Sequence, residues 1–171
     1  DYGLGDIQLL GDELSATVAA LGNSLSIDTT GVLTADITQN VGAEDITALA
    51  NISAGNVDAV SVTTAAIGNS LSANLGGTFN ATLDQTNTVD EISATSNIQT
   101  GVSGVGVTAT TAAIGNTATF SGVGQIQLAS LTQKSGADIK AVSVIKSVSP
   151  QAFSAVAAAI GNTMSITGLL N

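Results

Sequence analysis

Cysteine, histidine and tryptophan are absent from the 171-residue sequence, and aromatic residues make up only 2% of it. Without thiol or imidazole groups, the chain has no cysteine nucleophile, no histidine base and no soft-metal ligand set. The closely spaced glycines of GVSGVGVT at 101–108 lack the full phosphate-loop pattern and a following helix. Serines lie in repetitive segments rather than at a nucleophile elbow. These absences predict a protein that is not an enzyme and that has no cofactor.

Charge is also scarce, because charged residues make up 9% of the chain against about 25% in an average protein. Three lysines and no arginine leave a net charge of −10, which argues against binding to nucleic acid or to anionic membranes. No apolar run approaches the roughly 18 residues of a membrane span, so we expect no membrane insertion. The chain begins at Asp1 without a basic-then-apolar leader. This fits a secreted chain whose signal was removed, although expression trimming would look the same.

A short phrase occurs four times: AALGNSLS at 19–26, AAIGNSLS at 65–72, AAIGNTAT at 112–119 and AAIGNTMS at 158–165. Its asparagines are Asn23, Asn69, Asn116 and Asn162, at steps of 46, 47 and 46 residues. A fixed period of this length is typical of a repeat architecture. The 44% content of hydrophobic residues argues against disorder.

Two further segments recur with nearly the same period. Gln39, Gln85 and Gln133 mark the second segment; Asn51-Ile52, Asn97-Ile98 and Val144-Ile145 mark the third. Each segment alternates with period two, as a half-buried strand does. We therefore predict an all-β fold, a β-solenoid of about four coils with three strands per coil and a period of about 46 residues. It forms one domain, 1–171, with repeats at about 12–57, 58–104, 105–150 and 151–171 (partial), and with 1–11 as a shortened incoming strand of the third type.

The alternation also predicts which side chains face the core. For the first segment we expect Thr63, Ala65, Ile67, Asn69, Leu71 and Ala73 to point inward, and Val62, Thr64, Ala66, Gly68, Ser70 and Ser72 to point outward, with the same parity in the other copies. In the second segment the inward sets are Leu33, Ala35, Ile37, Gln39, then Phe79, Ala81, Leu83, Gln85, then Gln127, Ala129, Leu131, Gln133. In the third segment they are Ile46, Ala48, Ala50, Ile52, then Ile92, Ala94, Ser96, Ile98, then Ile139, Ala141, Ser143, Ile145.

A repeated buried asparagine needs a repeated partner, because an unpaired buried amide costs about 1–3 kcal/mol. If coils stack as rungs about 4.8 Å apart, each amide can hydrogen-bond to its equivalent in the next coil. We expect two such ladders, one of Asn23, Asn69, Asn116 and Asn162, and one of Gln39, Gln85 and Gln133. The glycine before each asparagine fits a bulge or a close approach of another backbone. A propeller is the main alternative fold, but no aromatic blade signature is present.

Carboxylates precede each third strand. Asp45, Glu91 and Asp138 should therefore stack at one corner, either screened by solvent or bound by backbone amides at the start of the strands. The second interpretation is a low-affinity Ca²⁺ site formed by the same three residues.

The predicted outward face of the first segment is small and regular: Ala20, Gly22, Ser24, Ser26, then Ala66, Gly68, Ser70, Ser72, then Ala113, Gly115, Thr117, Thr119, then Ala159, Gly161, Thr163, Ser165. A flat face of this kind could pack against a neighbouring filament. It could instead act as an ice-binding or surface-adhesin face. A polysaccharide-acting solenoid enzyme ranks lowest, because paired carboxylates facing out from mid-strand are lacking.

The pattern of Gly-Asn followed by alternating small residues and then Gln, as in NATLDQTN at 80–87, resembles the repeats of curlin, the major subunit of bacterial curli fibres. The resemblance covers only the order of residue types within the repeat, since curlin repeats have about half this period. It implies a secreted bacterial fibre subunit in a biofilm matrix or at a cell surface. Neither end of the sequence offers a capping helix or a lysine-rich edge. We therefore expect a homopolymer of copies stacked head to tail, an extracellular functional-amyloid filament open to lateral bundling.

Overall fold

The computed structural model describes residues 2–9, 13–30, 33–42, 44–54, 57–150 and 152–169. This part of the chain folds into nine β-strands and contains no helix that is long and apolar enough to cross a membrane. The strands are β1 (Tyr2–Leu9), β2 (Glu13–Thr29), β3 (Leu33–Val41), β4 (Ile46–Ala54), β5 (Val57–Leu75), β6 (Phe79–Asn87), β7 (Glu91–Ser135), β8 (Asp138–Pro150) and β9 (Phe153–Leu169).

Every strand pairs in parallel with its equivalent in a neighbouring coil. Leu21 lies beside Ile67, Ile67 beside Ile114, and Ile114 beside Ile160. The second and third segments pair in the same way, β3 with β6 and β4 with β7. The predicted all-β solenoid is therefore confirmed. As expected for a shortened strand of the third type, β1 pairs with β4, from Tyr2 beside Thr47 to Leu9 beside Ala54.

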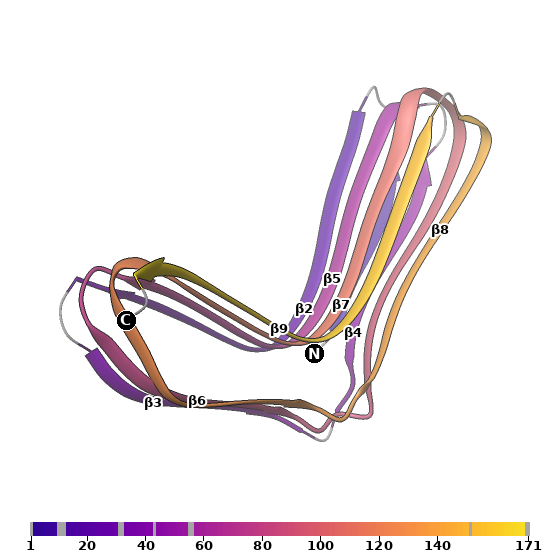
Figure 1. The fold of residues 1–171 in the computed structure, drawn as a ribbon. Helices are drawn as coiled ribbons and strands as arrows, with labels where there is room; N and C mark the ends of the chain where they lie inside the picture. The colour runs from indigo at the N-terminus through magenta and orange to yellow at the C-terminus, as the bar shows by residue number, and fades with distance from the viewer. Residues whose placement is uncertain are drawn as a thin grey trace.

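Each coil is bent into a V (Figure 1). The inner side of the V consists of four long strands, namely β2, β5, residues 106–122 of β7, and β9. In what we call the first arm, their N-terminal halves face β1, β4, residues 91–100 of β7, and β8. In the second arm, their C-terminal halves face β3, β6 and residues 126–135 of β7. We call the bend between the arms the elbow.

Each arm has its own hydrophobic core. The first-arm core includes Leu14, Val18, Ile46, Ile52, Val60, Val62, Ile92, Ile98 and Val107. The second-arm core includes Ile37, Leu71, Leu75, Leu83 and Phe120. The V shape brings the opposite walls of each arm close together. Each coil therefore has two small cores and not one continuous interior.

The long strand changes its inward parity at the elbow. In β5 the buried side chains are Val60, Val62, Thr64 and Ala66 before the bend, and Asn69, Leu71, Ala73 and Leu75 after it. Gly68 and Asn69 are consecutive and both buried, and a shift of one residue moves every later side chain to the other face. The predicted inward face is thus correct from Asn69 onward. It is wrong for Thr63, Ala65 and Ile67, whose side chains lie on the outer surface.

In the second and third segments, the predicted inward residues that the structure describes are buried or half-buried, except Leu131 of the C-terminal coil, which is 45% exposed. Ile46, Ala48, Ala50 and Ile52 are buried, as are Ile92, Ala94, Ser96 and Ile98. In the third copy of the second segment, the register shifts so that Ala81 lies beside Leu128 and Thr82 beside Ser130, which leaves Ala129 as an extra residue. The side-chain directions predicted for Phe79, Gln127 and Ala129 lie outside the described residues.

Candidate functional site

The Gly-Asn pair forms the elbow, and the glycine is needed there because two backbones approach closely. A Cβ on Gly22 would lie 2.5 Å from the carbonyl oxygen of Gly68, and a Cβ on Gly68 or Gly115 would lie closer still to the glycine oxygen of the following coil. Contacts this short require the backbone to move. The predicted close approach of another backbone is therefore present at Gly22, Gly68 and Gly115, each of which is followed by a further coil.

The asparagines are joined by side-chain hydrogen bonds that run in one direction. Asn23 Nδ2 donates to Asn69 Oδ1 at 3.0 Å, Asn69 to Asn116 at 2.7 Å, and Asn116 to Asn162 at 2.7 Å. The same nitrogen also donates to a backbone carbonyl at the end of the second-arm strand, as Asn116 does to Lys134 O at 2.7 Å. Asn69 and Asn116 are fully buried. Their polar atoms are thus satisfied by two kinds of partner.

The glutamines form a second ladder of opposite direction. Gln133 Nε2 donates to Gln85 Oε1, and Gln85 donates to Gln39, each at 2.7 Å. Each glutamine also donates across the second arm to a backbone carbonyl of a long strand, as Gln85 does to Thr117 O at 3.0 Å. The asparagine amides therefore point their donors toward the C-terminal coil, and the glutamine amides point theirs toward the N-terminal coil.

A buried hydroxyl network crosses the first arm, and sequence reasoning missed it. Ser96 Oγ lies 2.7 Å from Thr64 Oγ1 and 2.9 Å from Thr111 Oγ1. Unbroken alternation predicts that Thr64 and Thr111 point outward, because it misses the change of parity at the elbow. With the correct parity, the inward polar residues of facing strands would have indicated this contact.

The acidic corner keeps its predicted alignment, and a backbone amide at the start of a strand binds one of its carboxylates, as the first interpretation expects. The backbone N–H of Glu91 donates to Asp45 Oδ1 at 2.9 Å. The Glu91 carboxylate pairs with Lys140 at 2.5 Å, and Asp138 lies beside Glu91 in the register. The hydrogen bond from Lys140 holds the pKa of Glu91 below its ordinary value. Among the described residues, no group of three acidic side chains is arranged to hold a metal ion.

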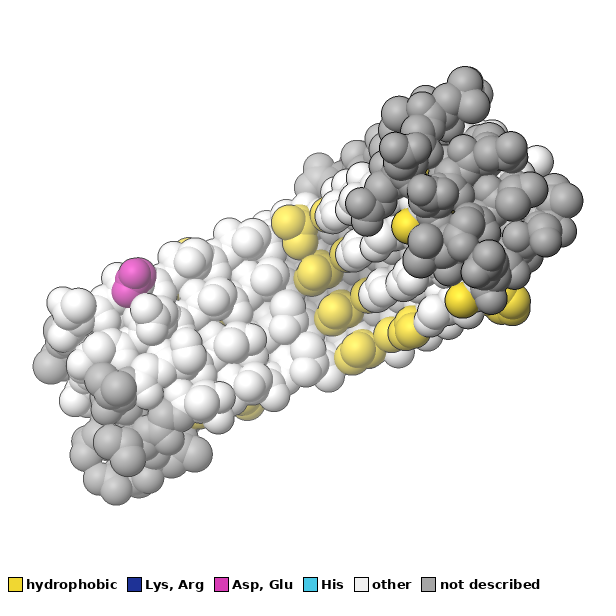
Figure 2. All heavy atoms as spheres, turned by 90° about the horizontal axis from the view of Figure 1, so that it is seen from above, with side chains coloured by type: hydrophobic (Ala, Val, Ile, Leu, Met, Phe, Trp, Pro, Cys, Tyr) yellow, Lys and Arg dark blue, Asp and Glu magenta, His cyan; other side chains and the backbone are white. Residues whose placement is uncertain are grey.

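The concave face of the V differs from the predicted flat face of small residues. Ala66 and Gly68 are buried, whereas Ser72 is exposed, so the predicted set divides at the elbow and is not one surface. The outward row at the elbow is instead apolar: Leu21 is 40% exposed and Ile160 is 38% exposed, with half-buried Ile67 and Ile114 between them. Seen from above, hydrophobic side chains form a row beside the mostly uncharged surface of one arm, on which an acidic side chain is visible (Figure 2).

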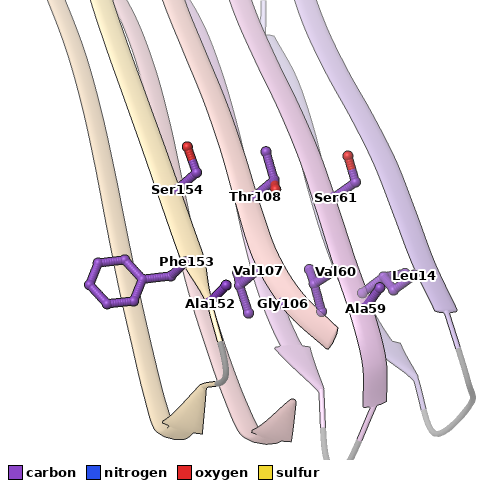
Figure 3. Close-up of a pocket in the computed structure, with 10 residues that line it drawn as sticks. All are labelled: Leu14, Ala59, Val60, Ser61, Gly106, Val107, Thr108, Ala152, Phe153 and Ser154. Carbon is purple, nitrogen blue, oxygen red and sulfur yellow. The ribbon is translucent and has the colours of Figure 1, made fainter. Parts of the chain in front are cut away.

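A shallow groove of 310 Å³ crosses the tip of the first arm over four coils (Figure 3). Leu14, Val60, Val107 and Phe153 are register equivalents there. The first three are at most 4% exposed, whereas Phe153 is 69% exposed. The groove lining contains no charged or catalytic side chain. Its main feature is that the C-terminal coil leaves a core position uncovered.

The family model described as holdfast attachment protein D matches residues 54–170, well over half of the chain. No curated protein and no solved structure matches the chain. The resemblance to curlin thus rests on the repeat residues alone. This match indicates a cell-surface adhesion component, and the chain belongs to the holdfast attachment protein D family.

Proposed function

We propose that this protein is a non-catalytic scaffold of a cell-surface attachment structure, in which copies stack head to tail into a filament. The observation that carries the proposal is the uncovered core of the C-terminal coil. Leu83 is 1% exposed, but its equivalent Leu131 is 45% exposed. Val107 is 1% exposed and its equivalent Phe153 is 69% exposed. Exposed apolar core positions beside open strand edges favour the addition of further strands.

The N-terminal coil supports the same proposal, because it offers a matching surface. Its long strand has the residue pattern of the coils above it, including the Gly22-Asn23 pair. A second copy placed on the C-terminal coil would therefore continue the same apolar and amide ladders. A filament built in this way would resist pulling along its axis through rows of parallel hydrogen bonds.

A second candidate function is direct adhesion through the concave face. The exposed Leu21 and Ile160 and the hydroxyls of Ser72 and Thr119 favour it, because apolar or hydroxyl side chains recur at these positions from coil to coil. This surface could equally serve in lateral bundling of filaments within a biofilm matrix. Serine substitution of Leu21 and Ile160 should then reduce adhesion or bundling while leaving single filaments intact.

Electron microscopy and fibre diffraction of the purified protein at neutral pH test the proposal. We expect filaments with an axial spacing of about 4.8 Å, the distance between paired strands. Purified protein that stays monomeric at every concentration tested would contradict stacking. Loss of surface attachment in cells that lack the protein would support the scaffold role, and unchanged attachment would contradict it.

A further inference from the structure

We infer that the C-terminal coil binds the N-terminal coil of a second copy in one register, with Gly161-Asn162 directly against Gly22-Asn23 of the next copy. This inference rests on the proposed stacking and specifies its joint. In that register β9 would pair with β2 of the next copy, and β8 with β1 of the next copy. The joint then repeats the pairings β2–β5 and β1–β4 that exist within the chain.

The ends of the asparagine ladder are complementary. Among the described residues, Asn162 Nδ2 donates only to Gln133 O, at 3.2 Å, whereas the asparagines below it each donate twice. At the other end, no described donor reaches Asn23 Oδ1. A head-to-tail joint brings this donor to this acceptor. Joining two C-terminal coils would instead leave two donors facing each other, so the ladder favours one orientation.

The elbow glycines give an independent reason for the same register. A Cβ on Gly22, Gly68 or Gly115 would strike the glycine carbonyl of the next coil, but a Cβ on Gly161 would meet nothing within 4 Å. Among the described residues, no atom near Gly161 therefore requires a glycine at this position. The glycine becomes required when the carbonyl of Gly22 of a second copy lies above it, as the carbonyl of Gly68 lies above Gly22.

The two ends of the stack differ in charge, with the lysines near the C-terminal end and most acidic residues near the N-terminal end. This difference favours head-to-tail contact. All three lysines, Lys134, Lys140 and Lys146, belong to the last complete coil. Eight of the 13 acidic residues lie within the first 57 residues: Asp1, Asp6, Asp12, Glu13, Asp28, Asp36, Glu44 and Asp45. In the proposed register the backbone of Asp6 of the next copy lies opposite Val144, two residues from Lys146. Opposite charges steer partners into one orientation and raise the association rate.

The joint would be complete in the first arm and at the elbow. In the second arm, the described residues supply three outer strands, β3, β6 and the end of β7, against four long strands. One outer strand position between Gln133 and Gln39 of the next copy would therefore stay open. The register is determined by β8, β9 and the Gly-Asn pair, and the glutamine ladder is interrupted at the joint.

Cysteine cross-linking tests the register directly, because the natural chain has no cysteine. Thr163 and Ser24 are both exposed, and the proposed joint makes them neighbours, as Thr117 and Thr163 are within the chain. A strand spacing of about 4.8 Å lies within the range that a disulfide spans. A mixture of Ser24→Cys and Thr163→Cys proteins should form a cross-linked dimer under mild oxidation, and neither variant alone should do so.

The intrachain pair Ser72→Cys and Thr119→Cys is the matched control, since these exposed residues are register partners. Filaments that form without the Ser24–Thr163 cross-link, while the control pair oxidises, would overturn the register but leave stacking intact. Dimers of Thr163→Cys alone would overturn the orientation. Absence of any association would instead overturn the proposed function.

Gly161→Ala provides the second arm of the test. We expect its unfolding midpoint to match that of the natural protein, and most of the Ser24–Thr163 cross-linking to be lost. Gly115→Ala should lower the unfolding midpoint, because its Cβ meets the Gly161 carbonyl inside the chain. Cross-linking of Gly161→Ala at the natural rate would overturn the inferred joint.

Discussion

Asn116 shows how a buried amide is accommodated in this protein. The spacing of the asparagines predicts a partner one coil away, and the structure contains these hydrogen bonds on both sides of Asn116. The bond to the backbone carbonyl of Lys134 could not be predicted. It depends on where the second-arm strand ends, and insertions of one or two residues between segments obscure that position in the sequence.

Replacing Asn116 by alanine should reduce the free energy of unfolding by about 1–3 kcal/mol for each buried polar group left unpaired. Asn69 Nδ2 would lose one of its two acceptors, Asn162 Oδ1 would lose its donor, and the carbonyl of Lys134 would lose a donor. Asn97→Ala is the control, because Asn97 also donates to its equivalent in the preceding coil, Asn51, but is exposed. Urea unfolding of both variants checks this; equal losses for the two would contradict a buried ladder.

The pair formed by Glu91 and Lys140 predicts a small pH dependence. The hydrogen bond between them lowers the pKa of Glu91 and raises the pKa of Lys140 from their ordinary values of 4.5 and 10.5. The contribution of Glu91 to stability is therefore present above pH 4.5 and is lost as pH falls through its lowered pKa. The contribution of Lys140 is present below pH 10.5 and is lost as pH rises through its raised pKa.

Thermal unfolding across acidic pH measures this effect. In Glu91→Gln the unfolding temperature should fall less steeply as the pH becomes acidic. The difference should be small, because exposed ion pairs contribute little to stability. Glu44→Gln, which removes an exposed carboxylate with no lysine partner among the described residues, is the matched control for the loss of one negative charge. An acid limb that is identical in natural protein and Glu91→Gln would show that the pair is not formed in solution.

At the scale of the strand, period-two alternation predicts the strands and most of their inward faces but misses the change of parity at the elbow. The reason lies in the residues themselves. Ala66 and Ile67 are both apolar, so hydrophobicity does not distinguish the two faces before the bend. The extra residue Ala129 is hidden for a similar reason, since Ile126 and Leu128 as well as Leu131 are apolar.

The hydroxyl network of the first arm provides a test at this scale. Ser96→Ala removes the common partner of Thr64 and Thr111, and we expect a loss of about 1–3 kcal/mol in unfolding free energy. Replacing all three hydroxyls, as Thr64→Val, Ser96→Ala and Thr111→Val together, should recover much of that loss, because no buried group is then left unpaired.

Denaturant unfolding of the single and triple variants, with exposed Ser53→Ala as the control, checks this prediction. A triple variant that is less stable than Ser96→Ala would show that the three hydroxyls do not form one network.

At the scale of the molecule, the sequence predicts a stack of similar coils but not the shape of one coil. Repeat spacing determines which residues lie above one another, and these vertical pairings agree with the structure. The angle between the arms depends on the Gly-Asn bend, where two consecutive residues point inward. The uneven burial of the two ends also needs the structure, because Val107 and Phe153 are equivalent in the repeat yet differ in exposure.

The change of parity at the elbow is the central structural claim, and thiol labelling of single-cysteine variants tests it most directly. The variants are Ala66→Cys, Ile67→Cys, Ser70→Cys and Leu71→Cys, in a chain that has no natural cysteine. Ala66 is fully buried and Leu71 is 1% exposed, whereas Ile67 and Ser70 are partly exposed. We predict fast labelling at 67 and 70 and protection at 66 and 71. Fast labelling at 66 and 70 with protection at 67 and 71 would instead show unbroken alternation and contradict the bent coil.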